Sequence, residues 1–309
     1  MHITRFDFSG IYETAYEDFS PAAEGPSFLY REKEDKITEN KNASYLIKCS
    51  DIKGTNAYCD AEAEAELRRR ICSVPEIPAG IHFLDNGNYH YLSALITGQI
   101  KISYALLLID HHPDCRTPAF GDVLSCGSWV LRSLQTQPML RRVVMAGVDE
   151  ALFQEELGAL SGEQKGSGSC GDGMTPGLLL EEKVHGMVAE RIRFVPDSGG
   201  SSLAESVMRQ LPEDLPVFLS IDKDVLSTEE VRTNWDQGEM RLEELLFLVE
   251  CVGRRRQILG VDICGEPAQA DAHLEFRPSC VFGGAGETCA EKSAAVNAAL
   301  VHTLLSVCG

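Results

Sequence analysis

The sequence predicts an α/β fold, a three-layer sandwich in which a central parallel β-sheet is flanked by helices. Short apolar runs recur along the chain, and stretches with helical character lie between them. Each run is nearly continuously apolar rather than alternating, as expected for strands that are covered on both faces. Strands that alternate with helices favour a parallel sheet with helices on both sides.

Six apolar runs are the predicted strands. They span residues 80–84, 104–109, 142–146, 191–195, 216–221 and 257–263. Three further segments are predicted to be helices, because strong helix formers or apolar residues recur there at helical spacing. These helices span residues 61–71, 241–252 and 290–307.

The chain of 309 residues is long enough for a large core, and we expect a single domain over 1–309. Residues 1–75 are less regular than the rest. A Gly/Ser-rich stretch at 161–177 lacks periodicity and is predicted to be a flexible loop. Strand-like runs resume after this stretch, so we place no domain boundary there.

Charge and composition exclude several classes of partner. The chain has 28 Lys+Arg against 47 Asp+Glu, a formal net charge of −19. This acidity argues against binding to nucleic acid or to an anionic membrane surface. No apolar run approaches the length of a membrane span. The 11 cysteines are scattered, and no export signal is evident, so we expect reduced thiols in a cytoplasmic protein.

Acidic and imidazole side chains follow three of the predicted strands. The second strand is followed by the sequence DHHPD, in which alternate residues share a face if the chain is extended. The carboxyl ends of parallel strands meet at one edge of a sheet, where sites form. The side chains that could converge there are His90, Asp110, His112, Asp114, Asp222 and Asp224.

This set of residues is larger than one metal ion needs. Mixed aspartate and histidine ligation suits Mn²⁺, Zn²⁺ or Fe²⁺ better than Ca²⁺ or Mg²⁺. Two ions roughly 3.5 Å apart would use the whole set. A single D-x-D pair could be only a helix cap or a turn. Three such strand ends together favour a metal site.

These motifs resemble those of the arginase/agmatinase (ureohydrolase) family, of which the chain looks like a divergent member. The family carries G-G-D-H, D-A-H-x-D and S-x-D-x-D in this order. The chain has GNYH at 87–90, DHHPD at 110–114 and SIDKD at 220–224. The resemblance implies a three-layer α/β fold with a parallel sheet, two Mn²⁺ ions, with Zn²⁺ or Fe²⁺ as alternatives, and usually a homo-oligomer.

The resemblance also implies the role of each motif residue. Asp110 and Asp222 would bridge the two ions. The first ion would also take His90 and Asp114, and the second would take His112 and Asp224. The implied activity is hydrolysis of a C–N bond in a small guanidino, amidino or formimino compound by a metal-bridging hydroxide. Asp224 would orient that hydroxide and is a candidate proton carrier.

The sequence departs from the family in the residues that would contact substrate. The family often has a histidine in an H-G motif after D-A-H-x-D, where this chain has Cys126. The family's D-x-x-E glutamate, which holds the guanidinium, is replaced by Gly265, with Glu266 one residue later. Glu266 can serve only if the backbone is bulged or already in a loop. Cys126 is either a reactive thiol or a small buried residue.

Four further residues could belong to the site or have ordinary roles. Asp236 and Trp235 would lie in a loop beside the metals, although a capping aspartate and a packed indole are commoner. His111 should face away from the ions. His185 and His273 could replace the missing shuttle, but surface or core placement is commoner for lone histidines.

Two other functions stay open. The first is a deacetylase-like metal amidohydrolase, because deacetylases share this fold and use one zinc with a separate His-His pair. The adjacent His111 and His112 resemble that pair only in part, since His112 lies inside the D-x-H motif. The second is a non-catalytic metal-binding protein on an arginase-like scaffold, which the altered residues Cys126 and Gly265 motivate.

Overall fold

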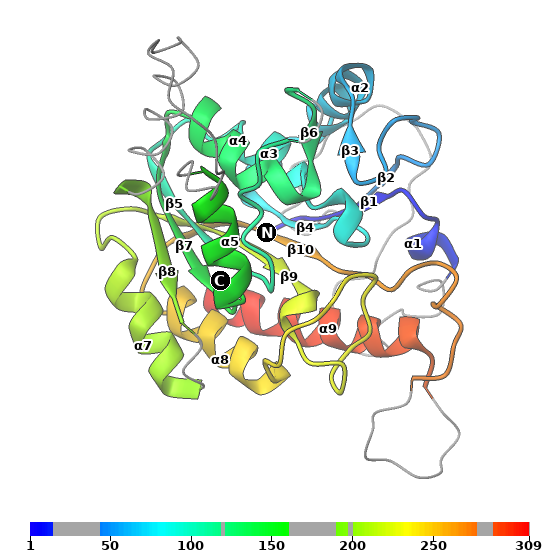
Figure 1. The fold of residues 1–309 in the computed structure, drawn as a ribbon. Coiled ribbons are helices and arrows are strands. Elements are labelled where there is room, and N and C mark those ends of the chain that lie inside the picture. The colour runs from blue at the N-terminus through cyan, green and yellow to red at the C-terminus, as the bar shows by residue number, and fades with distance from the viewer. Residues whose placement is uncertain (15–43, 119–120, 161–189, 197–199, 277–286, 309) are drawn as a thin grey trace, which may run out of the picture.

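The computed structural model describes residues 1–14, 44–118, 121–160, 190–196, 200–276 and 287–308. Its centre is an eight-stranded sheet with the order β2-β1-β4-β10-β9-β5-β7-β8 (Figure 1). All seven neighbouring pairs in this sheet are parallel. The strands are β1 (Ile3–Asp7), β2 (Ser44–Lys48), β4 (Ile81–Phe83), β5 (Tyr104–Ile109), β7 (Leu140–Ala146), β8 (Ile192–Val195), β9 (Val217–Asp222) and β10 (Ile258–Cys264).

Helices cover both faces of the sheet. Their bounds are α1 (Ile11–Thr14), α2 (Ala61–Ile71), α3 (Leu92–Thr97), α4 (Trp129–Thr136), α5 (Glu150–Leu160), α7 (Gly200–Gln210), α8 (Leu242–Gly253) and α9 (Cys289–Cys308). A separate antiparallel pair joins β3 (Tyr58–Cys59) to β6 (Leu124–Ser125). Four short 3-10 helices complete the described elements: η1 (Ile77–Ala79), η2 (Gly87–Tyr89), η3 (Cys126–Ser128) and η4 (Lys223–Val225).

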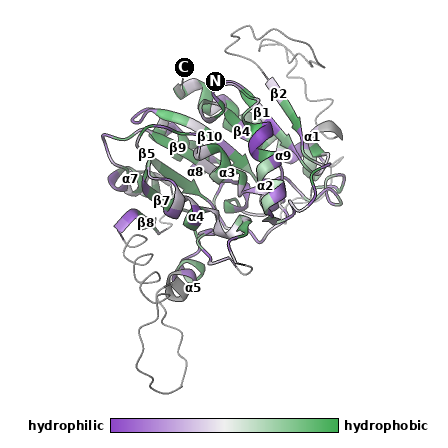
Figure 2. Cartoon of the chain, turned by 90° about the horizontal axis from the view of Figure 1, so that it is seen from above, coloured by the Kyte–Doolittle hydropathy of each residue, from purple (hydrophilic) through white to green (hydrophobic). Residues whose placement is uncertain are grey.

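The sheet separates two hydrophobic cores, which makes the architecture a three-layer sandwich. Alternate residues of β5 enter different cores: Leu106 and Leu108 pack with residues of α2, α3 and α4, whereas Leu107 and Ile109 pack with residues of α7, α8 and α9. The apolar residues gather in the central strands, while the outer faces of helices such as α2 and α7 carry polar residues (Figure 2). The predicted α/β fold is therefore confirmed.

All six predicted strands are present, and the three predicted helices correspond to α2, α8 and α9. The strands β1 and β2 were not predicted. Their sequences, ITRFD and SYLIK, mix polar with apolar residues, and β2 lies at the edge of the sheet, where a fully apolar strand is not needed. The predicted loop at 161–177 lies outside the described residues. None of the helices in the described ranges combines the length and apolar character that a membrane crossing requires.

Candidate metal centre

The DHHPD segment begins where β5 ends, and it turns sharply. The backbone N–H of His112 donates to Oδ1 of Asp110 at 2.6 Å. Asp114 has a left-handed backbone with φ of 50°, which is uncommon for a residue with a Cβ atom. The segment bends immediately after β5 and is not extended. The side chains of this segment therefore converge because the backbone turns, and not because alternate residues of an extended chain share a face.

The second aspartate pair lies at the end of β9. Asp222 is the last residue of this strand, and its carboxylate accepts a hydrogen bond from the backbone N–H of Asp224 at 3.0 Å. This contact caps the short helix η4 and brings both carboxylates to the same end of the sheet as DHHPD. Both carboxylates are buried.

His90 follows the short helix η2 beyond the end of β4. Its Nε2 lies 2.9 Å from Oγ of Ser220, so the opposite edge of the ring faces the aspartates. The Nδ1 atom lies 3.2 Å from Oδ2 of Asp110, 3.2 Å from Oδ2 of Asp114 and 3.5 Å from Oδ2 of Asp222. Three carboxylates from two strand ends therefore surround one imidazole nitrogen.

His112 makes the corresponding contacts on the other side of Asp110. Its Nδ1 lies 3.0 Å from Oδ2 of Asp224 and 3.7 Å from Oδ1 of Asp110. The candidate ligand atoms form two groups that share Asp110, with all atoms of a group within 4.8 Å of one another. One group contains His90 and Asp114, and the other contains His112 and Asp224.

The electrostatics of this cluster suit bound cations. Burial and the neighbouring carboxylates raise the pKa of Asp114 to about 6 and that of Asp224 well above its ordinary value. Burial lowers the pKa of His112, but Asp110 and Asp224 more than reverse this effect and raise it to about 12. The buried Oδ2 of Asp110 accepts no hydrogen bond from the described residues. This buried oxygen, which lies 3.2 Å from Nδ1 of His90 without a hydrogen bond of good geometry, is a ligand atom that a divalent ion would satisfy.

Comparison with known proteins gives one relative by sequence. The chain is 30% identical over 266 residues to an uncharacterized protein of Thermotoga maritima, and the match covers 86% of this chain and 80% of that protein. The two proteins belong to one family. No family model matches the chain.

Solved structures that resemble this one come from the ureohydrolases. They include a hypothetical agmatinase from Burkholderia thailandensis, at 13% identity, a TM-score of 0.56 and coverage of 98% of this chain and 84% of that one. Formiminoglutamase of Trypanosoma cruzi with Mn²⁺ has 12% identity, a TM-score of 0.55 and coverage of 98% and 92%. Arginase from Medicago truncatula has 15% identity, a TM-score of 0.53 and coverage of 99% and 86%.

The chain has the ureohydrolase fold. At these low sequence identities the likeness extends to the fold alone. The fold that the three motifs predicted is therefore confirmed.

Glu266 lies away from the His/Asp cluster. Its carboxylate accepts hydrogen bonds from Ser293 at 2.6 Å and Asn297 at 2.7 Å, both on α9, and lies 3.0 Å from Nζ of Lys223. Tyr12 contributes a further hydrogen bond at 3.2 Å. Despite burial, Lys223 and these donors keep the pKa of Glu266 below its ordinary value. The carboxylate is thus occupied by protein donors, and its predicted contact with a substrate stays a prediction.

Gly265, which stands in place of the ureohydrolase glutamate, is fitted closely to the metal cluster. Its backbone is left-handed, with φ of 88°. A Cβ atom at this position would lie 2.5 Å from Oδ1 of Asp222 and 2.9 Å from the backbone N of Lys223. The site thus requires glycine here, because any side chain would displace a candidate ligand.

Cys126 begins the short helix η3 and is buried. Burial, together with the charges of Asp114 and Asp222, raises the pKa of its thiol to about 12. Because the thiolate is disfavoured, the residue has the properties of a small buried group rather than those of a reactive thiol.

The chain has two tryptophans, and both lie against the imidazoles of the cluster. Trp129 donates from Nε1 to Oδ2 of Asp114 at 2.6 Å, and its ring centre lies 5.0 Å from that of His90. The ring centre of Trp235 lies 5.7 Å from that of His112. Sequence reasoning missed Trp129 because no motif marks it.

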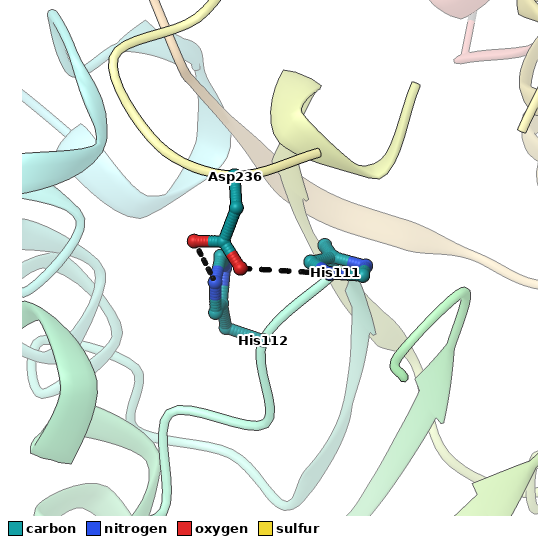
Figure 3. Close-up of side chains that lie close together, drawn as sticks. All are labelled: His111, His112 and Asp236. Carbon is teal, nitrogen blue, oxygen red and sulfur yellow. Dashed lines mark hydrogen bonds and ion pairs between the residues drawn. The ribbon is translucent and has the colours of Figure 1, made fainter. Parts of the chain in front are cut away.

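The remaining histidines lie outside the two central groups. His111 belongs to neither group, and its Nε2 lies 3.9 Å from Oδ2 of Asp236 (Figure 3). His273 is exposed, and His185 lies outside the described residues. Asp236 lies closer to His112, with 3.1 Å between its Oδ1 and Nε2 of that residue. Asp236 therefore lies beside the candidate metal centre rather than at a helix cap.

Proposed function

We propose that this protein is a binuclear manganese-dependent hydrolase of a C–N bond in a guanidino, amidino or formimino compound. The observation that carries the proposal is the pair of candidate ligand groups that share Asp110. The names of the similar structures, an agmatinase, a formiminoglutamase and an arginase, support this class of reaction. The formiminoglutamase structure includes Mn²⁺.

In this proposal, the residues divide between the two ions as the geometry suggests. His90 and Asp114 would hold one ion, and His112 and Asp224 would hold the other. Asp110, which belongs to both groups, and Asp222, 3.5 Å from His90, would be shared by the two ions. Two such ions would lower the pKa of a shared water, so that it becomes a nucleophile near neutral pH.

Asp224 is the proposed residue that orients the attacking water and carries its proton to the leaving amine. Its Oδ1 accepts a hydrogen bond from the backbone N–H of His111 at 3.1 Å, which fixes the carboxylate. Cys126 is a poor proton acceptor, since its thiol has a raised pKa. We therefore assign the proton transfer to Asp224 rather than to Cys126.

The substrate pocket differs from one that grips a guanidinium with glutamate. Gly265 offers no side chain, and the carboxylate of Glu266 is held by Lys223 and by α9. We propose a small-molecule substrate that is neither arginine nor agmatine. We also propose a cytoplasmic homo-oligomer with a single domain over 1–309, on the grounds given by its acidity, its cysteines and its motifs.

A metal-loaded activity screen tests this proposal. Purified protein would be loaded with Mn²⁺ and assayed for release of urea, ammonia or amine from guanidino, amidino and formimino compounds. We expect turnover of at least one compound, and its loss in Asp110→Asn. Turnover of an acetyl-lysine reporter with one bound Zn²⁺ would instead support the deacetylase-like alternative. Metal binding without turnover of any of these substrates would support the non-catalytic alternative.

A further inference from the structure

The loop at 233–238 carries a carboxylate, that of Asp236, to the outer edge of the candidate metal centre. We propose that Asp236 is a positioning residue, whose carboxylate holds the His112 imidazole so that Nδ1 faces the metal-binding aspartates. This inference rests on the proposed metal centre, and it adds a residue that none of the three motifs contains.

The two nitrogens of His112 have different partners on opposite edges of the ring. Nδ1 faces inwards, 3.0 Å from Oδ2 of Asp224. Nε2 faces outwards, 3.1 Å from Oδ1 of Asp236 (Figure 3). A carboxylate can only accept, so Nε2 carries a proton in this contact, and an ion bound at Nδ1 would replace only the inner proton. The second contact of Asp236, at 3.9 Å from His111, is too long for a hydrogen bond.

This arrangement is the one that a metal-binding histidine needs. A neutral imidazole has one protonated nitrogen and one free lone pair, and the hydrogen bond at the protonated nitrogen decides which is which. Carboxylates commonly accept from the non-ligating nitrogen of such histidines, which fixes the ring orientation and makes the ligand more basic. Asp236 would therefore select the tautomer of His112 in which Nδ1 is the ligand.

The loop that carries Asp236 is fastened to both halves of the centre. Asn234 accepts a hydrogen bond from the backbone N–H of Gly87 at 2.9 Å, in the turn that leads to His90. Trp235 donates to Asn88 in the same turn at 3.0 Å. On the other side, the backbone N–H of Gly238 donates to the carbonyl of Asp224 at 2.7 Å. A side chain that is 69% exposed is thus carried by an anchored backbone.

The same three side chains, His111, His112 and Asp236, could instead hold an ion of their own, since their ligand atoms lie within 4.8 Å of one another. That ion would have to use Nε2 of His112, whose lone pair is available only when Nδ1 carries the proton. His112 would then no longer be a ligand of the inner ion, which only the aspartates would hold. Two ions per chain agree with a positioning role for Asp236, and three would indicate a ligand role.

Manganese binding to the full chain distinguishes these possibilities. Mn²⁺ affinity and stoichiometry would be measured by equilibrium dialysis for the wild type, Asp236→Ala, Asp236→Asn and the control Glu239→Gln. Glu239 is an exposed acid three residues further along the same segment. We expect Asp236→Ala to weaken one of the two sites by about 10- to 100-fold. Asp236→Asn should recover part of the loss, because its amide oxygen can still accept from Nε2, and Glu239→Gln should bind as the wild type does.

Three other outcomes would contradict the positioning role of Asp236. Wild-type binding of two ions that is equally tight in Asp236→Ala would overturn the positioning role while leaving the proposed function intact. Three ions in the wild type and two in Asp236→Ala would make Asp236 a ligand. Wild-type protein that binds no Mn²⁺ would overturn the proposed function and this inference together. The melting temperature of the metal-free variants should match the wild type, since Asp236 is largely exposed.

Discussion

Lys223 and Glu266 form an ion pair inside the protein, with 3.0 Å between Nζ and Oε2 and side chains that are 0% and 1% exposed. Lys223 stands between the two proposed ligands Asp222 and Asp224 but points away from them, towards Ser293 and Asn297 on α9. Because both charges are buried, each depends on the other for its compensation.

Removal of either partner of this pair should destabilise the fold. We predict that Glu266→Gln or Lys223→Met lowers the free energy of unfolding by about 3–5 kcal/mol, because an uncompensated charge is left in the interior. The double variant should lose less than the sum of the two single losses. Urea denaturation measures all three variants. A Glu266→Gln protein of unchanged stability whose KM rises would show that Glu266 contacts substrate after all.

Replacement of Gly265 by any other residue should weaken metal binding. We predict that Gly265→Ala binds Mn²⁺ far more weakly than the wild type, because the new methyl would lie 2.5 Å from Oδ1 of Asp222. Gly121→Ala is the matched control, since Gly121 is also left-handed, with φ of 59°, but a methyl there would meet no atom of the described residues within 4 Å. Both variants should carry a backbone strain of about 1–2 kcal/mol. Equal Mn²⁺ affinity in the two would contradict the proposed role of Asp222.

Removal of the Trp129 indole should weaken the binding of one ion more than that of the other. Its Nε1 donates to Oδ2 of Asp114, a candidate ligand of the ion that His90 would hold. We predict that Trp129→Phe weakens that site by about 10- to 100-fold and leaves the His112 site unchanged. Stepwise Mn²⁺ titration by calorimetry would resolve the two sites. Equal weakening of both sites would point to a general loss of packing instead.

Glu156 should make stability fall with rising pH. Burial raises the pKa of this carboxyl from 4.5 to about 7, although it accepts hydrogen bonds from Cys115 and Arg116. A raised pKa in the folded state means that its contribution to stability is complete below pH 4.5 and is lost as the pH rises through 7. Glu156→Gln should therefore gain about 2–3 kcal/mol relative to the wild type between about pH 5 and pH 8.

Urea unfolding of chelator-treated protein at both pH values checks this prediction. The exposed control Glu239→Gln should show no such trend with pH. A stability difference between Glu156→Gln and the wild type that stays constant, or that changes in the opposite direction, would show that Glu156 remains ionised throughout.

The sequence was most informative where chemistry is concentrated in short motifs. The central strands were predictable because they are buried on both faces, and the six candidate ligands follow three of them. The contacts that surround these ligands were not predictable. Asp236 is 124 residues from His112, and Lys223 is 70 residues from Ser293. Only the packing of the fold brings such residues together, and the partners of Glu266 on α9 could not be predicted from the sequence for the same reason.

The measurement that tests the central claim most directly is the number of Mn²⁺ ions bound per chain in the wild type, Asp110→Asn and Asp114→Asn. Asp110 belongs to both candidate ligand groups, whereas Asp114 belongs to one. We predict two ions in the wild type, one in Asp114→Asn and none held tightly in Asp110→Asn. A wild type that binds a single ion, or an Asp110→Asn protein that keeps as many ions as Asp114→Asn, would contradict a binuclear centre bridged by Asp110.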